Sequence, residues 1–225
     1  MARMIGKVYT LNGVEKATVI YTNAGNLIIP LVQVLLGKEW VVYTTGYILV
    51  STVFIWTHGR MLICEETGFN CKELLKNVNV VASIIGILMF ALKIQLPSLI
   101  IETMDSMSAT IAPICMIVAG MLIAGMDVKD CLKNNRLYVI TFLKMIIFPL
   151  FAVVLFKFTN LSSMAKNGEM ILLISLLASV APTAASVTQI AQIYDADSEY
   201  ASAYYFITTM LCILTMPFFV WMYQF

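Results

Sequence analysis

Two apolar stretches carry amide and hydroxyl side chains beside a proline, and such side chains can bind a small polar solute. In the first, TNAGNLIIPL, Asn23 and Asn26 lie one turn before Pro30. In the second, SVAPTAASVTQIAQ, Pro182 is followed by Thr183, Ser186, Gln189 and Gln192. A carboxamide offers two donors and one acceptor without a permanent charge, which suits a carboxylate. The alternative is structural: a kink at each proline and ordinary hydrogen bonds between helices.

The two prolines predict two interrupted membrane helices. Hydrocarbon offers no hydrogen-bond partner and proline removes a backbone donor, so a break at Pro30 or Pro182 requires protein, water or a solute beside it. Small neighbours such as Gly25 and Ala181 permit a close crossing. The positive N-terminal ends of the half-helices favour an anion. We therefore predict a substrate site built from Asn23, Gly25, Asn26, Pro30, Pro182, Thr183, Ser186 and Gln189.

Three charged residues are candidates for attracting the solute or coupling its movement to an ion. Lys144 lies inside the apolar run TFLKMIIFPLF, where a central lysine costs about 2.5–3.5 kcal/mol on insertion scales and must face protein or water. It could attract an anion, or form a structural pair, or extend to the cytoplasmic interface. Glu102 and Asp105 lie three residues apart and could exchange a proton if they were desolvated. Ordinary exposure at the outer interface is the alternative for both.

The composition is that of an integral membrane protein. The chain of 225 residues is 60% hydrophobic and 12% charged, whereas soluble domains are about a quarter charged. A net charge of +1 without a basic stripe argues against a nucleic-acid partner. Five scattered cysteines and a single histidine, His58, predict neither a metal site nor a bound cofactor. No cluster of catalytic side chains indicates an enzyme.

About 20 apolar residues are needed to cross the hydrocarbon core of a membrane. This length predicts an all-α protein with seven membrane helices, at 15–36, 41–62, 78–94, 97–125, 133–157, 168–193 and 199–223. With a cytoplasmic N-terminus, the inner segments hold nine Lys and Arg residues and the outer segments four. The positive-inside rule therefore predicts an inner N-terminus and an outer C-terminus in the cell membrane.

Two parts of the chain resemble each other, 15–62 and 168–223. Each has a proline-containing span, a short charged turn with an aromatic residue, and a Thr-rich span. Three predicted spans precede the second part and none precedes the first, which is explained if three N-terminal helices are missing. We expect one transmembrane domain over 1–225, made of the end of a first repeat at 15–62, a cytoplasmic loop at 63–77 and a second repeat at 78–225.

These residues resemble the auxin efflux carrier family, which includes bacterial malate- and malonate-type permeases and the plant auxin exporters. The family's fourth-helix pattern, N-x-G-F-x-G-x-P-L, is similar to the chain at Asn23, Gly25, Pro30 and Leu31. Asn26 and Ile28 stand in place of Phe and the second Gly. Later similarities, in the family's order, are Leu96-Pro97, Ala112-Pro113, Lys144 with Pro149, Ala181-Pro182-Thr183-Ala184 and Thr215-Met216-Pro217.

The resemblance implies ten helices in two inverted repeats of five, with the first three absent here and the fourth and ninth broken and crossing. It also implies a secondary active carrier of small organic anions, such as malate or auxin-like acids, working by alternating access with H⁺ or Na⁺ coupling. Its partners would be the anion, membrane lipid and, in a homodimer, a second copy. Two other hypotheses stay open: a truncated remnant that does not transport, and a seven-helix receptor.

Overall fold

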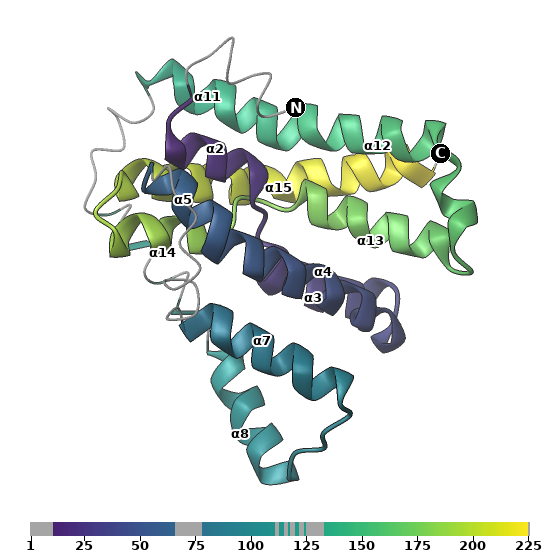
Figure 1. Cartoon of the computed structure of the whole chain (residues 1–225). Helices are drawn as coiled ribbons and strands as arrows, with labels where there is room; N and C mark the ends of the chain where they lie inside the picture. Colours follow the sequence, from purple (N-terminus) through teal and green to yellow (C-terminus); the bar gives the residue numbers. More distant parts are fainter. Residues whose placement is uncertain are drawn as a thin grey trace.

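The computed structural model describes residues 11–65, 78–110, 113–114, 117, 120–121, 124 and 133–224. Every regular element within this part of the chain is a helix (Figure 1), so the predicted all-α class is confirmed. Most of the predicted loop 63–77 and most of the second half of the predicted span 97–125 lie outside the described residues. The same holds for Ala112 of the family-like pair Ala112-Pro113.

The first half of the helix bundle contains a helix interrupted after two turns. Its elements, in order, are α2 (Gly13–Ile20), α3 (Ala24–Leu35), a 3₁₀ turn (Lys38–Trp40), α4 (Val41–Phe54), a π-helical turn (Ile55–Gly59) and α5 (Arg60–Ile63). Gly37 reverses the chain between α3 and α4 with φ 108°, a conformation that glycine adopts without a steric penalty. Helices α3 and α4 therefore lie side by side and antiparallel (Figure 1).

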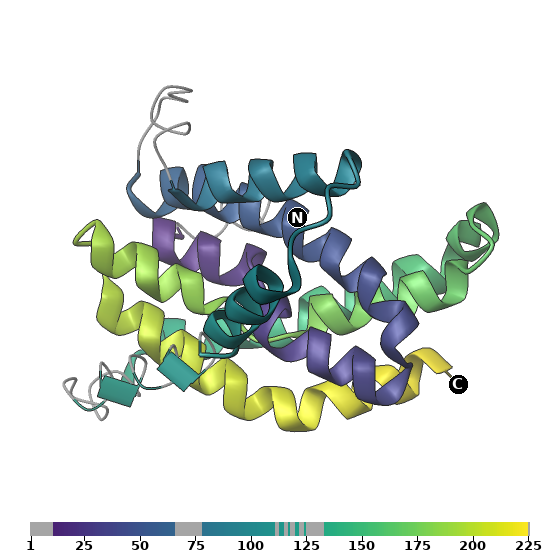
Figure 2. The ribbon, with the colours of Figure 1, turned by 90° about the horizontal axis from the view of Figure 1, so that it is seen from below.

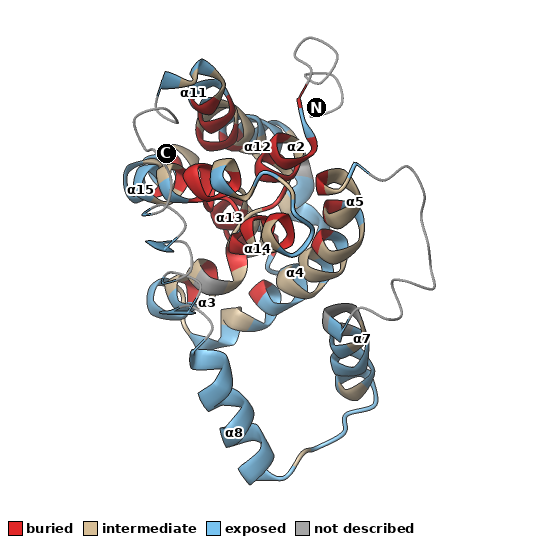
Figure 3. Cartoon of the chain, turned by 90° about the vertical axis from the view of Figure 1, so that its left-hand side faces the viewer, coloured by how far each residue is buried: buried red, intermediate tan, exposed pale blue. Residues whose placement is uncertain are grey.

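The second half contains two helices joined by a π-helical turn, then an interrupted helix and a long final helix. Its elements are α11 (Asn135–Phe142), a π-helical turn (Leu143–Ile147), α12 (Phe148–Phe158), a 3₁₀ turn (Asn160–Met164), α13 (Gly168–Val180), α14 (Ala185–Ile193) and α15 (Ser198–Gln224). Helix α13 lies at the centre, because it packs against α3, α4, α12 and α15. Its C-terminal half is buried almost all round, including Leu176, Leu177 and Val180 (Figure 3).

Two further helices lie beside this bundle. Helix α7 (Val78–Ala91) packs along α4 (Figure 2). Helix α8 (Ser98–Ala109) has no buried residue and lies apart from the bundle (Figure 3). Glu102 and Asp105, the predicted proton-exchanging pair, are both exposed on α8, which agrees with the alternative of ordinary surface exposure.

Three helical segments among the described residues are long and apolar enough to cross a membrane: Lys38–Ile63, Asn135–Phe158 and Ser198–Gln224. Helix α13 is apolar but shorter, because its interruption ends it at Val180. Large apolar side chains such as Val50, Phe151 and Leu214 are exposed on these helices, as expected when lipid surrounds them. The chain is an all-α membrane protein, while the total of seven spans and the inverted repeat stay predictions.

An ion pair fastens the start of α2 to the start of α11. Glu15 is part of a capping box with Asn12, in which each side chain pairs with the other's backbone N–H at 2.8 Å. The Arg136 guanidinium donates to both oxygens of the same carboxylate, at 2.8 and 2.6 Å. The Glu15 side chain is 4% exposed and that of Arg136 is 41% exposed. The carboxylate therefore depends on Arg136 for charge compensation.

We expect Arg136→Met to lower the free energy of unfolding by about 2 kcal/mol. This value lies between the cost of losing a surface ion pair and the cost of breaking a buried one. The physical reason is that it leaves the Glu15 carboxylate buried and uncompensated. Thermal unfolding in detergent micelles measures this as a decrease of roughly 4–8 °C. Adding Glu15→Gln should recover part of the loss, and Lys166→Met, at an exposed lysine, is the control. A loss that Glu15→Gln does not reduce would show that the two residues are not coupled.

Candidate functional site

The two interrupted helices cross at their interruptions and pair there through the backbone. Thr22 and Thr183 form an isolated antiparallel bridge. The Asn23 N–H donates to the Pro182 carbonyl at 2.7 Å, and the Ala184 N–H donates to the Tyr21 carbonyl at 3.1 Å. Each break therefore supplies hydrogen-bond partners that the other needs in a medium without water.

The second interruption lies at Pro182, as the sequence predicts. Helix α13 ends at Val180 and α14 begins at Ala185. Ala181 has φ −57° and ψ 147°, the extended conformation that a following proline imposes on its neighbour. The chemistry of the proline is therefore sufficient to explain why the helix stops here.

The first interruption does not lie at Pro30, and that prediction is wrong. The break runs from Tyr21 to Asn23, and α3 continues through Pro30, which is exposed. A proline inside a helix removes one hydrogen bond and can be absorbed as a kink. In the pairing with the second interruption, the Asn23 N–H and the Tyr21 carbonyl bond to Pro182 and Ala184 instead of within their own helix. This pairing therefore decides where the helix opens.

A pocket of about 230 Å³ opens beside the crossing. It is lined by Thr22, Asn23, Ala24 and Gly25 from the first interruption, by Ala184, Ala185, Ser186 and Gln189 from the second, and by Ile48, Ser51, Thr52 and Ile55 from α4 and the turn after it. The structure thus brings together four of the predicted residues: Asn23, Gly25, Ser186 and Gln189. Ser51 and Thr52 were not predicted, although the Thr-rich character of their span was the available signal.

The other predicted residues lie elsewhere. Thr183 is fully buried and does not line the pocket. Its hydroxyl donates to the Thr18 carbonyl at 3.4 Å, and its N–H donates to the Thr208 hydroxyl at 3.1 Å. Pro182 is buried in the bridge, and Pro30 does not line the pocket. Asn26 belongs to the first turn of α3, but its side chain lies outside the described part of the chain.

The helix ends give the pocket its electrostatic character. Helices α3 and α14 both begin at its wall, with Asn23 and Ala184 as N-caps, and neither N-cap side chain bonds to its helix. The first N–H groups of a helix have no partner within it, and together they carry a partial positive charge. No lysine, arginine, aspartate or glutamate lines the pocket. Among the lining residues, the backbone at these helix ends is therefore the source of positive potential.

Lys144 lies at the crossing but not in this pocket. Its ammonium group donates to the carbonyls of Val19 at 3.1 Å and Tyr21 at 3.4 Å, at the C-terminal end of α2. The side chain is 1% exposed and extends from a π-helical turn. Both contacts are to backbone carbonyls and not to an acid, and the role of Lys144 in attracting the solute or coupling its movement to an ion stays a prediction.

Tyr21 is a buried residue that the sequence did not single out. Its hydroxyl lies 2.9 Å from the carbonyl of Phe54, the last residue of α4. It also lies 2.9 Å from Nδ1 of His58, in the π-helical turn that follows. These bonds fasten the break in the first helix to the wall of the pocket. An aromatic residue directly before the polar pair Thr22-Asn23 was the only signal in the sequence.

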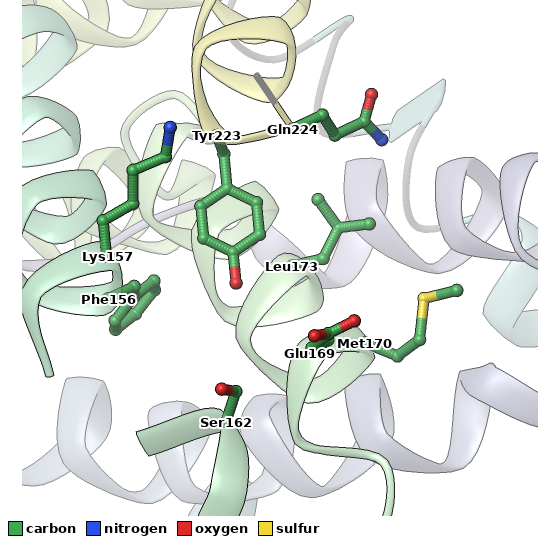
Figure 4. A pocket seen from close by; sticks show the side chains of 8 residues that line it. All are labelled: Phe156, Lys157, Ser162, Glu169, Met170, Leu173, Tyr223 and Gln224. Atoms are coloured by element: carbon green, nitrogen blue, oxygen red, sulfur yellow. The ribbon is translucent and has the colours of Figure 1, made fainter. Parts of the chain in front are cut away.

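Two further cavities lie away from the crossing. One, of about 430 Å³, lies where α12 and α15 end and α13 begins, with Lys157, Glu169 and Tyr223 among its lining residues (Figure 4). The other, of about 610 Å³, is an apolar groove between α3, α13 and α15, lined by residues such as Leu31, Leu177 and Met216. Neither one contains the ends of two half-helices.

Interrupted helices that cross beside a polar pocket within an all-α membrane protein are typical of secondary transporters. The family profile described as "Membrane transport protein", that of the auxin efflux carriers, matches residues 62–220. Since this match covers well over half of the chain, the protein belongs to that family, as its sequence resemblance predicts. No curated protein matches the chain.

The crossing can be tested by a cross-link. Thr22 and Thr183 lie opposite each other in the bridge, and its two backbone hydrogen bonds join their neighbours rather than these two residues. Antiparallel pairs of this kind have Cα atoms about 4.5 Å apart, within the range of a disulfide. We expect Thr22→Cys with Thr183→Cys to form a disulfide upon mild oxidation, detected by mass spectrometry of the linked peptides. Thr22→Cys with Thr159→Cys, at the far end of α12, should not. Equal cross-linking of both pairs would contradict the crossing.

Proposed function

We propose that the protein binds and carries small organic anions, with the pocket at the crossing as the substrate site. The observation that supports this most is that two half-helices present their N-terminal ends to one pocket that contains no charged side chain. A carboxylate accepts hydrogen bonds from such N–H groups and is favoured by the helix dipoles. Membership in a family of transport proteins supports movement of the bound anion across the membrane.

The pocket also restricts the size and shape of the solute. At about 230 Å³ it is smaller than typical drug-sized sites, which begin near about 300 Å³. Asn23 and Ser186, one from each interruption, offer donors and acceptors, and Ile48 and Ile55 add apolar surface to the lining. These features favour a mono- or dicarboxylate with a short carbon chain.

Alternating access would proceed by movement of the crossing unit relative to the helices around it. The segments 13–63 and 168–224 share the order of helix, break, helix, turn and long helix, which supports a structural repeat. The end with Glu15 and Arg136 is the cytoplasmic one in this proposal, and the end with Lys157 and Lys166 is the outer one. Coupling to H⁺ or Na⁺ would drive uptake or export.

We expect Asn23→Ala to weaken carboxylate binding by about 10- to 100-fold, the cost of removing a hydrogen bond to a charged group. The measurement is the rise in unfolding temperature of the purified protein with malate or malonate, followed by uptake of the labelled acid into proteoliposomes. Asn167→Ala, at an exposed asparagine outside the pocket, is the matched control.

The outcomes separate the hypotheses. Unchanged affinity in Asn23→Ala would remove this side chain from the site. Binding without uptake would favour the non-transporting remnant over the carrier. Absence of both binding and uptake, across a series of mono- and dicarboxylates with an imposed pH gradient, would overturn the proposed function.

A further inference from the structure

Among the carbonyls that the crossing leaves without their helical donors are those of Val19 and Val180. In a continuous helix the Val19 carbonyl would accept from the N–H of Asn23, but that N–H donates to Pro182. Likewise, the Val180 carbonyl would accept from Ala184, whose N–H donates to Tyr21. Val19 and Val180 thus have equivalent positions at the C-terminal ends of α2 and α13, where the helix dipoles are negative.

The protein satisfies these two carbonyls in different ways. The Val19 carbonyl accepts from the Lys144 ammonium at 3.1 Å, while the Val180 carbonyl accepts from the Cys212 thiol at 3.8 Å. A thiol is a weak neutral donor, whereas an ammonium group brings a unit positive charge and three donors. Only the α2 end has a second carbonyl, that of Tyr21, bonded to the same cation, at 3.4 Å.

Carbonyls at the ends of interrupted helices are the groups that coordinate Na⁺ in many secondary transporters. Here the ammonium group has the corresponding position, within a site that excludes water because Lys144 is 1% exposed. Two buried hydroxyls with no hydrogen-bond partner among the described residues lie nearby in the chain: Thr18, beside Val19, and Thr141, one helical turn before Lys144. Such oxygens are suitable ligands for a small monovalent cation.

We propose that Lys144 is a tethered cation that fills a monovalent-cation site at the C-terminal end of α2, so that the crossing is stable without Na⁺. Removal of the side chain opens this site to a free, small monovalent cation, such as Na⁺ or methylammonium. The inference concerns the stability of the crossing and does not depend on the proposed transport activity. Lys144 is a positioning residue, because it acts on the half-helix and not on the solute.

The test uses the unfolding temperature of the whole chain in detergent, measured without solute in chloride salts of Na⁺, methylammonium and the bulky N-methylglucamine at equal ionic strength. We expect the wild-type temperature to be the same in all three. We expect Lys144→Ala to unfold at a lower temperature in N-methylglucamine and to regain about 4 °C or more, saturably, with Na⁺ or methylammonium. Cys212→Ala, which removes the donor at the equivalent carbonyl, should show no dependence on the cation.

Two further results decide the proposal. Lys144→Gln keeps a hydrogen-bond donor without the charge, and wild-type stability of this variant would overturn the role of the charge. If Lys144→Ala does not survive extraction, its yield of folded protein is compared between Na⁺ and N-methylglucamine. A yield or unfolding temperature that no small cation raises would overturn the proposal. Because no carboxylate is present, failure of carboxylate binding leaves this test unaffected.

Discussion

The hydrogen bonds exchanged between the two interruptions are the constraint on which the rest of the bundle depends. An interrupted helix exposes polar backbone groups, and hydrocarbon cannot satisfy them. Neither α2–α3 nor α13–α14 would be stable alone at this depth. Because Asn23 donates to Pro182 and Ala184 donates to Tyr21, each break completes the other. The four half-helices therefore form one unit, and α4, α12 and α15 pack around it.

The same crossing separates the two kinds of helix end. The N-terminal ends of α3 and α14 face the pocket, while the C-terminal ends of α2 and α13 bond to Lys144 and Cys212 from other helices. The helix ends therefore give the pocket positive potential without a charged side chain in its lining. A site of this kind can attract an anion from water and still release it, because dipoles and amides hold a carboxylate less tightly than a buried salt bridge would.

The sequence was sufficient to predict the helical class, the membrane and the second interruption, because composition, length and a proline determine these locally. It failed at the first interruption, where Tyr21 and Thr22 have no strong intrinsic tendency to end a helix and a partner distant in sequence opens the backbone. Ser51 and Thr52 of α4 were also missed, because packing between segments distant in sequence brings them to the pocket. The position of Lys144 in an apolar run did not reveal that its side chain bonds to carbonyls at the C-terminal end of α2.

The two interruptions also differ in what keeps the helix open. The second break is built into the chain, since Pro182 has no N–H to donate and forces Ala181 out of the helical conformation. The first break has no such covalent cause, because every residue from Tyr21 to Asn23 retains its N–H and could continue a helix. The open form of this segment must therefore be stabilised from outside. The backbone pairing with the second interruption holds Tyr21 and Asn23, and the buried ammonium of Lys144 bonds to the carbonyl of Tyr21, within the break, and to that of Val19, near the end of α2. Contacts from distant parts of the chain therefore stabilise the first interruption, whereas a covalent feature of Pro182 makes the second.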